Sequence, residues 1–274
     1  MRVLEQKPDQ AVSRYINRYL LVEADKSEMP EVKILPTGYS YLSKVFGELS
    51  RVESPTKSGY IPRFFLGGQI TRQDISLFPV HEFIHFGIEF KPTGIHHFFN
   101  IDMSETVNGF EDGNVLLEEQ VSEELLSLID SNSFEDSCNK LDDYFIQLLR
   151  RSSKQEKDQQ IEKAVDLIIE NANSISINDL AQKVFLSPRQ LRRKFKEICG
   201  IPPGAYRNII QINNVYSSIA KNDEKRLSEL AYHCGFYDTS HFVKTFEKLM
   251  NEKPLDFINR DDSFLQTYIK YARD

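Results

Sequence analysis

The sequence predicts an α+β N-terminal domain, β-rich and then helical, followed by an all-α C-terminal domain with two helix-turn-helix units joined by a helix. Three observations predict this architecture. Alternating and aromatic-rich segments occupy residues 39–90, apolar residues at helical spacing follow, and residues 174–260 contain a duplicated pattern. With 274 residues, of which 40% are hydrophobic, the chain can build two domains with real cores.

The N-terminal half is expected to begin with short strands. The segments rich in alternating or aromatic residues are "YSYLSKVF" (39–46), "RFFLGGQIT" (63–71) and "HEFIHFGIEF" (81–90). They are separated by Gly, Pro and Ser clusters, as strands are. In the third segment a period of two places Phe86, Ile88 and Phe90 with Ile84 on an apolar face. Phe83, His85 and Glu89 fall on the other face.

Beyond Pro92 the pattern becomes helical. Segments 115–130 and 138–151 repeat apolar residues every three or four positions, which predicts amphipathic helices packed on the strands. Part of the same apolar stripe could instead form a homodimer interface. The polar segment 150–160 is either a solvated linker or the exposed turn of a continuing helix. We therefore expect an N-terminal regulatory domain over residues 1–152 and a C-terminal domain over residues 153–274.

Charge is unevenly distributed along the chain. The net charge is -7, yet residues 161–260 contain 15 Lys and Arg against 12 Asp and Glu, while the remainder contains 19 against 29. Within that basic part, "SPRQLRRKFKEICG" (187–200) concentrates three arginines and two lysines. The two parts are therefore expected to face different partners, the basic one a polyanion.

The duplicated pattern consists of two copies of a short helix, a tight turn and a second helix. Leu180 matches Leu230 at an offset of 50 residues, and Ser187 matches Asp238 at an offset of 51, so one residue is inserted in the second turn. Ser187 and Asp238 are predicted to cap the second helices, with Gln190 completing an S-x-x-Q capping box. Gly200 and Asn251 suit the left-handed residue that ends a helix.

The second helix of the first copy has two contrasting faces. Leu191, Phe195 and Ile198 form an apolar stripe, and the opposite face carries Arg189, Arg192, Arg193 and Lys196. A charged face is usually only a solvated surface. In a helix-turn-helix unit, however, this helix enters the DNA major groove, where arginine pairs with guanine and lysine neutralises phosphate.

The second copy has an electrostatically weak face made of Ser240, Val243, Lys244 and Glu247. We expect it to contribute less, through phosphate and hydroxyl contacts and through Val243 against a thymine methyl. A helix from Pro203 to Lys221 is predicted to join the copies. Its length of roughly 27 Å at 1.5 Å per residue is of the order of the 34 Å between successive major-groove faces.

Residues 174–260 resemble the AraC/XylS family of bacterial transcription regulators. The motifs that carry the resemblance are "ISINDLAQKVFLSPRQLRRKFKEICGIPPGAY" and "RLSELAYHCGFYDTSHFVKTFEKLMNEKPLDF". Asn251 departs from the family's usual glycine. A shorter segment, residues 86–108, is similar to the N-terminal half of uncharacterised sensor-type members. The resemblance implies double-stranded DNA and RNA polymerase as partners. The expected DNA-binding residues are Arg189, Gln190, Arg192, Arg193, Lys196, Thr239, Ser240, Val243 and Lys244.

Other chemistry is less well supported by the sequence. His81, His85, His96 and His97 lie close together, but no cysteine or carboxylate spacing completes a metal site, so ligand-pocket lining or ordinary hydrogen bonding is expected instead. No cofactor and no catalytic residue is predicted, because the G-x-S-x-G, P-loop and dinucleotide fingerprints are missing. A metal- or substrate-dependent N-terminal enzyme with an appended DNA-binding domain remains the alternative, and a ligand-free interaction module is a third.

The leading hypothesis is a sequence-specific DNA-binding regulator controlled by a small-molecule effector or by association through its N-terminal domain. A cytoplasmic location is expected, since no apolar run approaches the roughly 18 to 20 residues of a membrane span and no signal peptide begins the chain. Cys138, Cys199 and Cys234 are expected to be reduced thiols. The sequence leaves the effector, the target DNA, the oligomeric state and the choice between activator and repressor open.

Overall fold

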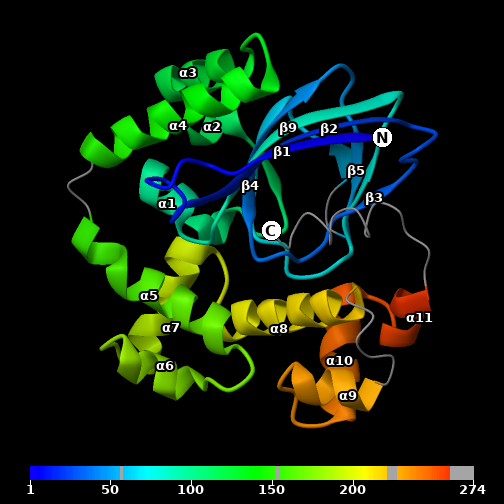
Figure 1. The fold of residues 1–274 in the computed structure, drawn as a ribbon, viewed down its shortest axis with the longest axis vertical. Coiled ribbons are helices and arrows are strands. Elements are labelled where there is room, and N and C mark those ends of the chain that lie inside the picture. The colour runs from blue at the N-terminus through cyan, green and yellow to red at the C-terminus, as the bar shows by residue number, and fades with distance from the viewer. Residues whose placement is uncertain (56–57, 152–154, 221–226, 260–274) are drawn as a thin grey trace.

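A computed structural model describes residues 1–55, 58–151, 155–220 and 227–259. Figure 1 shows a β-rich part with helices on one side and, below it, a helical part built on the long helix α8. The expected order, a β-rich half followed by helices, is confirmed, except that a short strand at residues 110–112 lies among the first helices. The proposed boundary after residue 152 lies outside the described residues, between the helices α4 and α5.

The strands form two antiparallel sheets. The larger sheet has the order β1 (Arg2–Gln6), β2 (Ile16–Asp25), β9 (Glu82–Phe90), β4 (Ser40–Phe46), β7 (Phe64–Gly67), β10 (Phe110–Asp112). The smaller sheet has the order β3 (Val32–Lys33), β8 (Ser76–Phe78), β5 (Arg51–Glu53), β6 (Ser58–Tyr60). The three strand segments expected from the sequence correspond to β4, β7 and β9.

After β9 the described chain is helical except for β10, which lies between η1 (Met103–Glu105) and α2 (Gly113–Leu116). The helices of the N-terminal part are α1 (Gly94–Phe99), the 3-10 turn η1, α2, α3 (Glu119–Ile129) and α4 (Phe134–Arg151). Those of the C-terminal part are α5 (Gln155–Asn171), α6 (Ile177–Lys183), α7 (Pro188–Cys199), α8 (Pro203–Ala220), α9 (Leu227–His233), α10 (Thr239–Met250) and α11 (Pro254–Asn259). Among the described residues, no helix combines the length and apolar character that crossing a bilayer requires.

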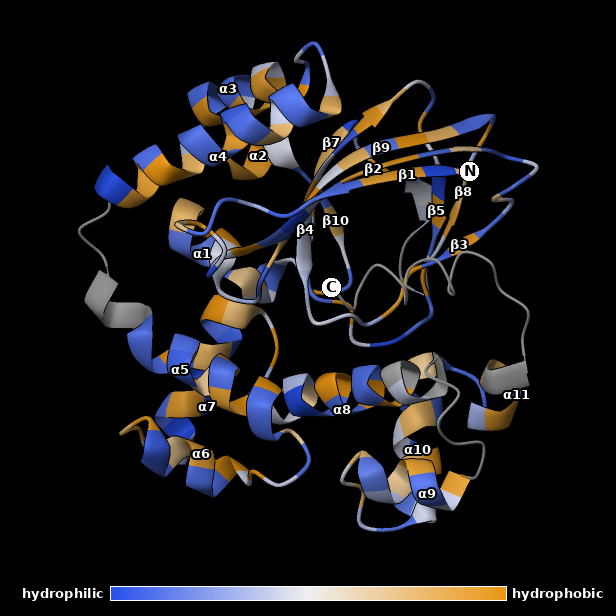
Figure 2. Ribbon diagram, viewed as in Figure 1, coloured by the Kyte–Doolittle hydropathy of each residue, from blue (hydrophilic) through white to orange (hydrophobic). Residues whose placement is uncertain are grey.

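The central strand β9 is buried on both faces. As predicted, Phe86, Ile88 and Phe90 share one face, which packs against α3 and α4 through residues such as Leu125 and Phe145. The opposite face is also buried, because the smaller sheet covers it and encloses a second core that includes Phe83. Figure 2 shows the resulting pattern: hydrophobic residues follow the strands, and α4 and α7 carry both hydrophobic and hydrophilic residues.

One buried ion pair ties β2 to β9. Arg18 and Glu89 face each other in the register of the two strands, and their side chains are 1% and 0% exposed. The guanidinium Nε donates to Glu89 Oε1 at 2.9 Å and Nη2 donates to Oε2 at 3.3 Å. The Tyr41 hydroxyl donates to the same carboxylate at 2.5 Å, and Asn17 donates a further bond. The charges of Arg18 and Glu89 are therefore compensated by neighbouring side chains in the protein interior rather than by solvent.

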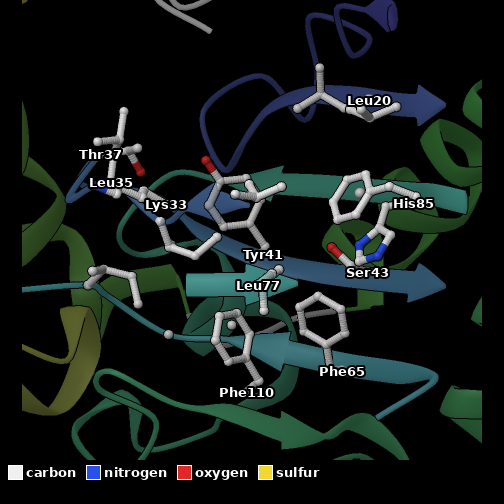
Figure 3. Close-up of a pocket in the computed structure, with 18 of the residues that line it drawn as sticks. Leu20, Lys33, Leu35, Thr37, Tyr41, Ser43, Phe65, Leu77, His85 and Phe110 are labelled. Carbon is white, nitrogen blue, oxygen red and sulfur yellow. The ribbon is translucent and has the colours of Figure 1, made fainter. Parts of the chain in front are cut away.

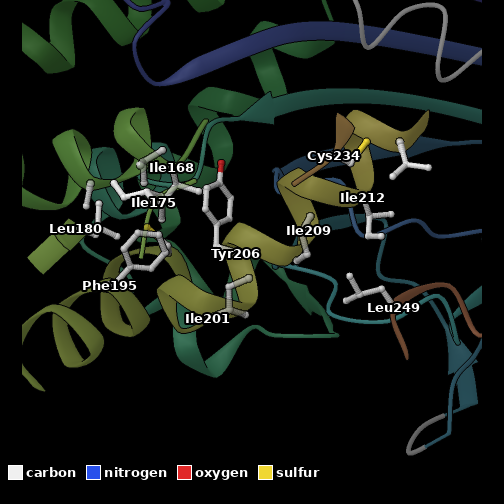
Figure 4. Close-up of a cluster of buried hydrophobic side chains, with 14 of the residues drawn as sticks. Ile168, Ile175, Leu180, Phe195, Ile201, Tyr206, Ile209, Ile212, Cys234 and Leu249 are labelled. Carbon is white, nitrogen blue, oxygen red and sulfur yellow. The ribbon is translucent and has the colours of Figure 1, made fainter. Parts of the chain in front are cut away.

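The third core belongs to the C-terminal helices and also takes in part of the N-terminal half. Its members come from α5 through α11, and Leu35, from the loop after β3, packs among them. Figure 4 shows Tyr206, Ile209 and Ile212 of α8 projecting into this cluster together with Phe195 and Leu249. The loop carrying Leu35 is thus shared between the two halves of the molecule.

Removing the negative partner of the buried pair is expected to be costly. The substitution Glu89→Gln removes the fully buried counter-charge of Arg18 and leaves only the more exposed Glu5 beside it. It should lower the free energy of unfolding by about 3 kcal/mol. Chemical denaturation followed by circular dichroism measures this change. The matched control is Glu23→Gln, which breaks a solvent-exposed pair with Arg2 and should cost less than about 1 kcal/mol. Similar small losses for both variants would contradict the structural role of Glu89.

Candidate nucleic-acid interface and ligand cavity

The helix α7 begins with the capping box expected from the sequence. Ser187 Oγ accepts from the backbone N–H of Gln190 at 3.3 Å, and Gln190 Oε1 accepts from the backbone N–H of Ser187 at 3.0 Å. Pro188 occupies the first helical position, where no N–H donor is needed. In the second copy, Asp238 Oδ1 accepts from His241 N–H at 2.7 Å. Both second helices therefore start at defined residues.

The two faces of α7 separate as predicted. Leu191, Phe195 and Ile198 are buried in the C-terminal core. The predicted DNA-binding residues of this helix are all exposed: Arg189, Gln190, Arg192, Arg193 and Lys196. Because the four cations among them project from one side of a single helix, α7 presents a concentrated positive surface.

The predicted residues on α10 are more varied in exposure. Ser240 and Lys244 are exposed, whereas Thr239 and Val243 are half-buried. Val243 packs against the C-terminal core, so only part of its side chain is accessible. The accessible part of α10 therefore carries less positive charge than that of α7, in line with the weak face expected from its sequence.

The turns of the two units share one backbone conformation. Phe185 has φ 56° in the first turn, and Gly235, 50 positions later, has φ 73° in the second. Their backbone N–H groups donate to equivalent carbonyls three residues back, at 3.1 Å in both cases. Tyr237 is then the extra residue of the second turn, and it is 92% exposed. The insertion inferred from the repeat is confirmed, but the left-handed conformation of Phe185 was not expected from the sequence.

Both units are attached to the N-terminal part. At the end of α7, Gly200 lies so close to the 3-10 turn η1 that a Cβ there would approach the Met103 carbonyl oxygen to 2.9 Å. At the end of α10, the Leu249 carbonyl accepts from Gln73 N–H at 2.7 Å, and Arg72 donates to the Asn251 side chain at 2.5 Å. The relative placement of α7 and α10 therefore depends on the β-rich half as well as on α8.

The joining helix α8 meets the same half between these two attachments. The Thr37 carbonyl accepts from Asn213 Nδ2 at 2.7 Å. The next residue, Gly38, has φ 85°, and a Cβ at that position would lie 3.1 Å from the Tyr206 ring. Gln69 donates to the Gly38 carbonyl at 3.0 Å and holds this close approach in place. No sequence signal identified this contact, because it joins residues far apart in the chain.

A cavity of about 180 Å³ lies between the two sheets of the β-rich part. Figure 3 shows side chains from both sheets, among them Leu20, Phe65 and Leu77, pointing toward one another around it. Leu35 and Thr37, of the loop that packs against α8, also line the cavity. The wall of the cavity and the contact with α8 are therefore formed by one continuous segment.

The four histidines noted in the sequence do not form one cluster. The His81 side chain is exposed, whereas His85 is buried and lines the cavity. His96 Nδ1 lies 2.7 Å from a backbone carbonyl oxygen, and His97 stacks on Tyr15 with ring centroids 3.9 Å apart. In the portion of the chain that is described, no group of three or more His, Cys, Asp or Glu could hold a metal ion. Cys138, Cys199 and Cys234 are buried thiols, as expected.

Comparison with known proteins assigns the C-terminal part. Residues 180–260 match a family model described as a helix-turn-helix domain. Over 124 residues, the chain is 31% identical to the HTH-type transcriptional activator RhaS of Escherichia coli O157:H7, a stretch that covers 43% of this chain and 44% of RhaS. The C-terminal part of the chain is therefore a helix-turn-helix domain similar to those of AraC/XylS regulators. The chain spans less than half the length of the curated relatives that it matches.

Two solved structures resemble the chain. ToxT from Vibrio cholerae is 15% identical and aligns over 88% of this chain and 97% of ToxT, with a TM-score of 0.49. A transcriptional regulator with an AraC-type DNA-binding domain from Chromobacterium violaceum is 26% identical and aligns over 38% of this chain and 96% of its own, with a TM-score of 0.34. Residues 4–111 match a model described as a domain of unknown function.

The glycine in the second turn should tolerate no side chain. Gly235→Ala combines a positive φ with a Cβ only 2.4 Å from Asn173 and should lower the free energy of unfolding by at least about 2 kcal/mol. The control is Gly204→Ala in the first turn of α8, where the nearest atoms to a Cβ belong to the Ile177 side chain and lie 4.0 Å away, an ordinary van der Waals contact. That change should be neutral or stabilising by up to about 1 kcal/mol. Thermal unfolding of both variants checks the contrast, and equal melting temperatures would refute the close contact at Gly235.

Proposed function

We propose that the chain is a sequence-specific, DNA-binding transcription regulator whose residues 1–152 sense a small molecule or mediate association. The observation that carries the proposal is the exposed cationic face of α7 in a helix-turn-helix unit of AraC type. Such a face is suited to a polyanion with a regular groove, because arginine pairs bidentately with guanine edges and lysine neutralises phosphates. A cytoplasmic location and contact with RNA polymerase belong to the same proposal.

The residues have unequal roles in this proposal. Arg189, Arg192 and Arg193 read base edges from α7, with Gln190 beside them and Lys196 on a phosphate. The accessible residues of α10 bind at the second major groove, mainly by contacts with the sugar-phosphate backbone of the DNA. They are Thr239, Ser240, Val243 and Lys244. Since α7 carries more positive charge than α10, the first unit supplies most of the salt-dependent affinity.

Regulation is proposed to pass through the loop of residues 33–38. This loop lines the cavity with Leu35 and Thr37 and also contacts α8 through Thr37 and Gly38. A molecule that fills the cavity displaces or stiffens this wall, and the change reaches the helix that sets the spacing of α7 and α10. The cavity and the DNA-binding helices are then coupled through the loop of residues 33–38, which lines the cavity and packs on α8.

Association of two copies is a further part of the proposal. Leu116, Val121 and Leu126 belong to the apolar stripe noted in the sequence, yet each is only partly buried in the helical layer over the larger sheet. The remaining apolar surface of α2 and α3 is available to a second copy of the chain. A dimer would present four helix-turn-helix units to one DNA site and raise its avidity.

The base-reading role of α7 can be tested with Arg192. The substitution Arg192→Ala removes a bidentate contact and should weaken binding to a selected DNA site by about 1 to 3 kcal/mol, with relaxed preference at one base pair. Lys196→Ala should instead weaken binding to all sequences and reduce the salt slope by about 1. Binding selection followed by fluorescence anisotropy measures both effects. The control Arg150→Ala removes an exposed cation of α4 and should leave affinity unchanged, whereas equal effects of all three variants would reject the assignment.

The coupling role of the loop can be tested with two glycines of similar backbone. Gly38 and Gly47 both have positive φ, 85° and 74°, but only Gly38 would bring a Cβ against α8. Gly38→Ala should therefore lower DNA affinity about threefold or more, because the two helix-turn-helix units lose their fixed placement. Gly47→Ala imposes similar backbone strain in open space and should leave DNA affinity unchanged. Unchanged affinity in a folded Gly38→Ala variant would contradict the coupling.

A further inference from the structure

The cavity between the two sheets is lined mainly by apolar side chains. These include Leu20, Val22, Phe65, Ile70, Leu77 and Phe110. Its volume of about 180 Å³ is slightly larger than the roughly 150 Å³ of an engineered apolar cavity that binds benzene. The space therefore suits a molecule with about one ring and a few substituent atoms.

One polar side chain in this lining has an unused hydrogen-bonding atom. His85 is 8% exposed, lines the cavity, and its Nε2 atom has no hydrogen-bond partner among the described residues. Phe83 stacks on the imidazole with ring centroids 4.0 Å apart and an interplanar angle of 9°, which fixes the orientation of the ring. A buried polar atom without a partner costs free energy. A ligand that supplies the missing partner recovers that cost.

A second polar group lies beside this imidazole. The register of β4 and β9 pairs Val45 with His85 and Ser43 with Gly87, so Ser43 and His85 lie on the same face of the sheet. Figure 3 shows the Ser43 hydroxyl and the His85 ring close together at one end of the cavity. A neutral imidazole and a hydroxyl each offer both a donor and an acceptor. Together they can hydrogen-bond to a ligand hydroxyl, which donates and accepts, or to a ligand carbonyl, which only accepts.

The charges around the cavity favour an uncharged ligand. Burial lowers the pKa of His85 from 6.5 to about 3, so the ring is neutral at physiological pH. The Arg18 guanidinium is held by the carboxylates of Glu89 and Glu5. Lys33 also lines the cavity, but it is an exposed residue at the rim. An anion placed beside His85 would therefore be desolvated without a compensating charge.

We propose that the cavity takes a small, uncharged, largely apolar molecule whose single hydroxyl or carbonyl group hydrogen-bonds to His85, with Ser43 as the neighbouring partner. This inference rests on the proposed function, because it names the chemical class of the effector. It also predicts selectivity. A site that hydrogen-bonds a hydroxyl discriminates against an isostere that lacks it, since the polar groups of the protein are then left without partners.

The test uses three probes of similar shape and different head group: p-cresol, toluene and 4-methylbenzoate. Titration calorimetry on the full chain should show p-cresol binding at one site per chain, about tenfold tighter than toluene, which is the worth of one hydrogen bond. 4-Methylbenzoate should bind more weakly than either. Tightest binding of 4-methylbenzoate, lost on Lys33→Ala, would overturn the proposal in favour of an anionic ligand at the rim. Absence of binding by all three probes would overturn it as well.

Variants assign the interaction to the imidazole. His85→Phe keeps a flat ring and should bind p-cresol and toluene equally, because only the hydrogen bond is lost. If that variant does not fold, Ile34→Phe offers a second route: Ile34 is half-buried in the lining, and a larger side chain there should block all probes. Retained preference for p-cresol in His85→Phe, or undiminished binding in Ile34→Phe, would overturn the assignment.

A DNA-binding assay on the same samples separates this inference from the proposed function. DNA affinity with no p-cresol binding refutes the ligand class and leaves the regulator intact. Selective p-cresol binding through His85 by a chain with no affinity for any DNA would support the ligand class and refute the regulator.

Discussion

The close approach of Gly38 to Tyr206 is the contact on which the arrangement of the molecule depends. Tyr206 is 1% exposed, and burial raises the pKa of its hydroxyl well above the ordinary value, so the ring stays neutral inside the core. Its ring lies 5.7 Å from that of Phe195 on α7. A glycine on the facing loop lets α8 lie directly against the β-rich half. The first helix-turn-helix unit, the joining helix and the cavity wall therefore meet around one aromatic side chain.

Much of the helical half could be predicted from sequence because its signals are local. The cap at Ser187, the left-handed residue Asn251 and the apolar stripe of Leu191 and Phe195 each follow from residues within a few positions. The repeat added a second copy of the cap, the apolar stripe and the helix end. The cationic face of α7 followed from helical periodicity alone, and its exposure in the structure agrees with that pattern.

The remaining features depend on residues that are distant in sequence. Nothing local to β9 shows that its second face is covered, because the covering strands β3, β5 and β8 are short and lie on other parts of the chain. The sequence placed His85 in a strand but could not show that it lines a cavity. Phe185 adopts a conformation that glycine occupies in the second unit, and only comparison of the two turns at an offset of 50 residues makes the exchange visible.

The attachment of the C-terminal part at Gly200 and again at Asn251 has a consequence for the length of an operator. A framework held at both ends cannot follow a duplex whose half-sites are moved apart. One additional base pair rotates the second half-site by about a tenth of a turn relative to the first. In the proposed function, an operator of altered spacing is therefore bound through one helix-turn-helix unit only, because the fixed distance between the two units matches a single spacing.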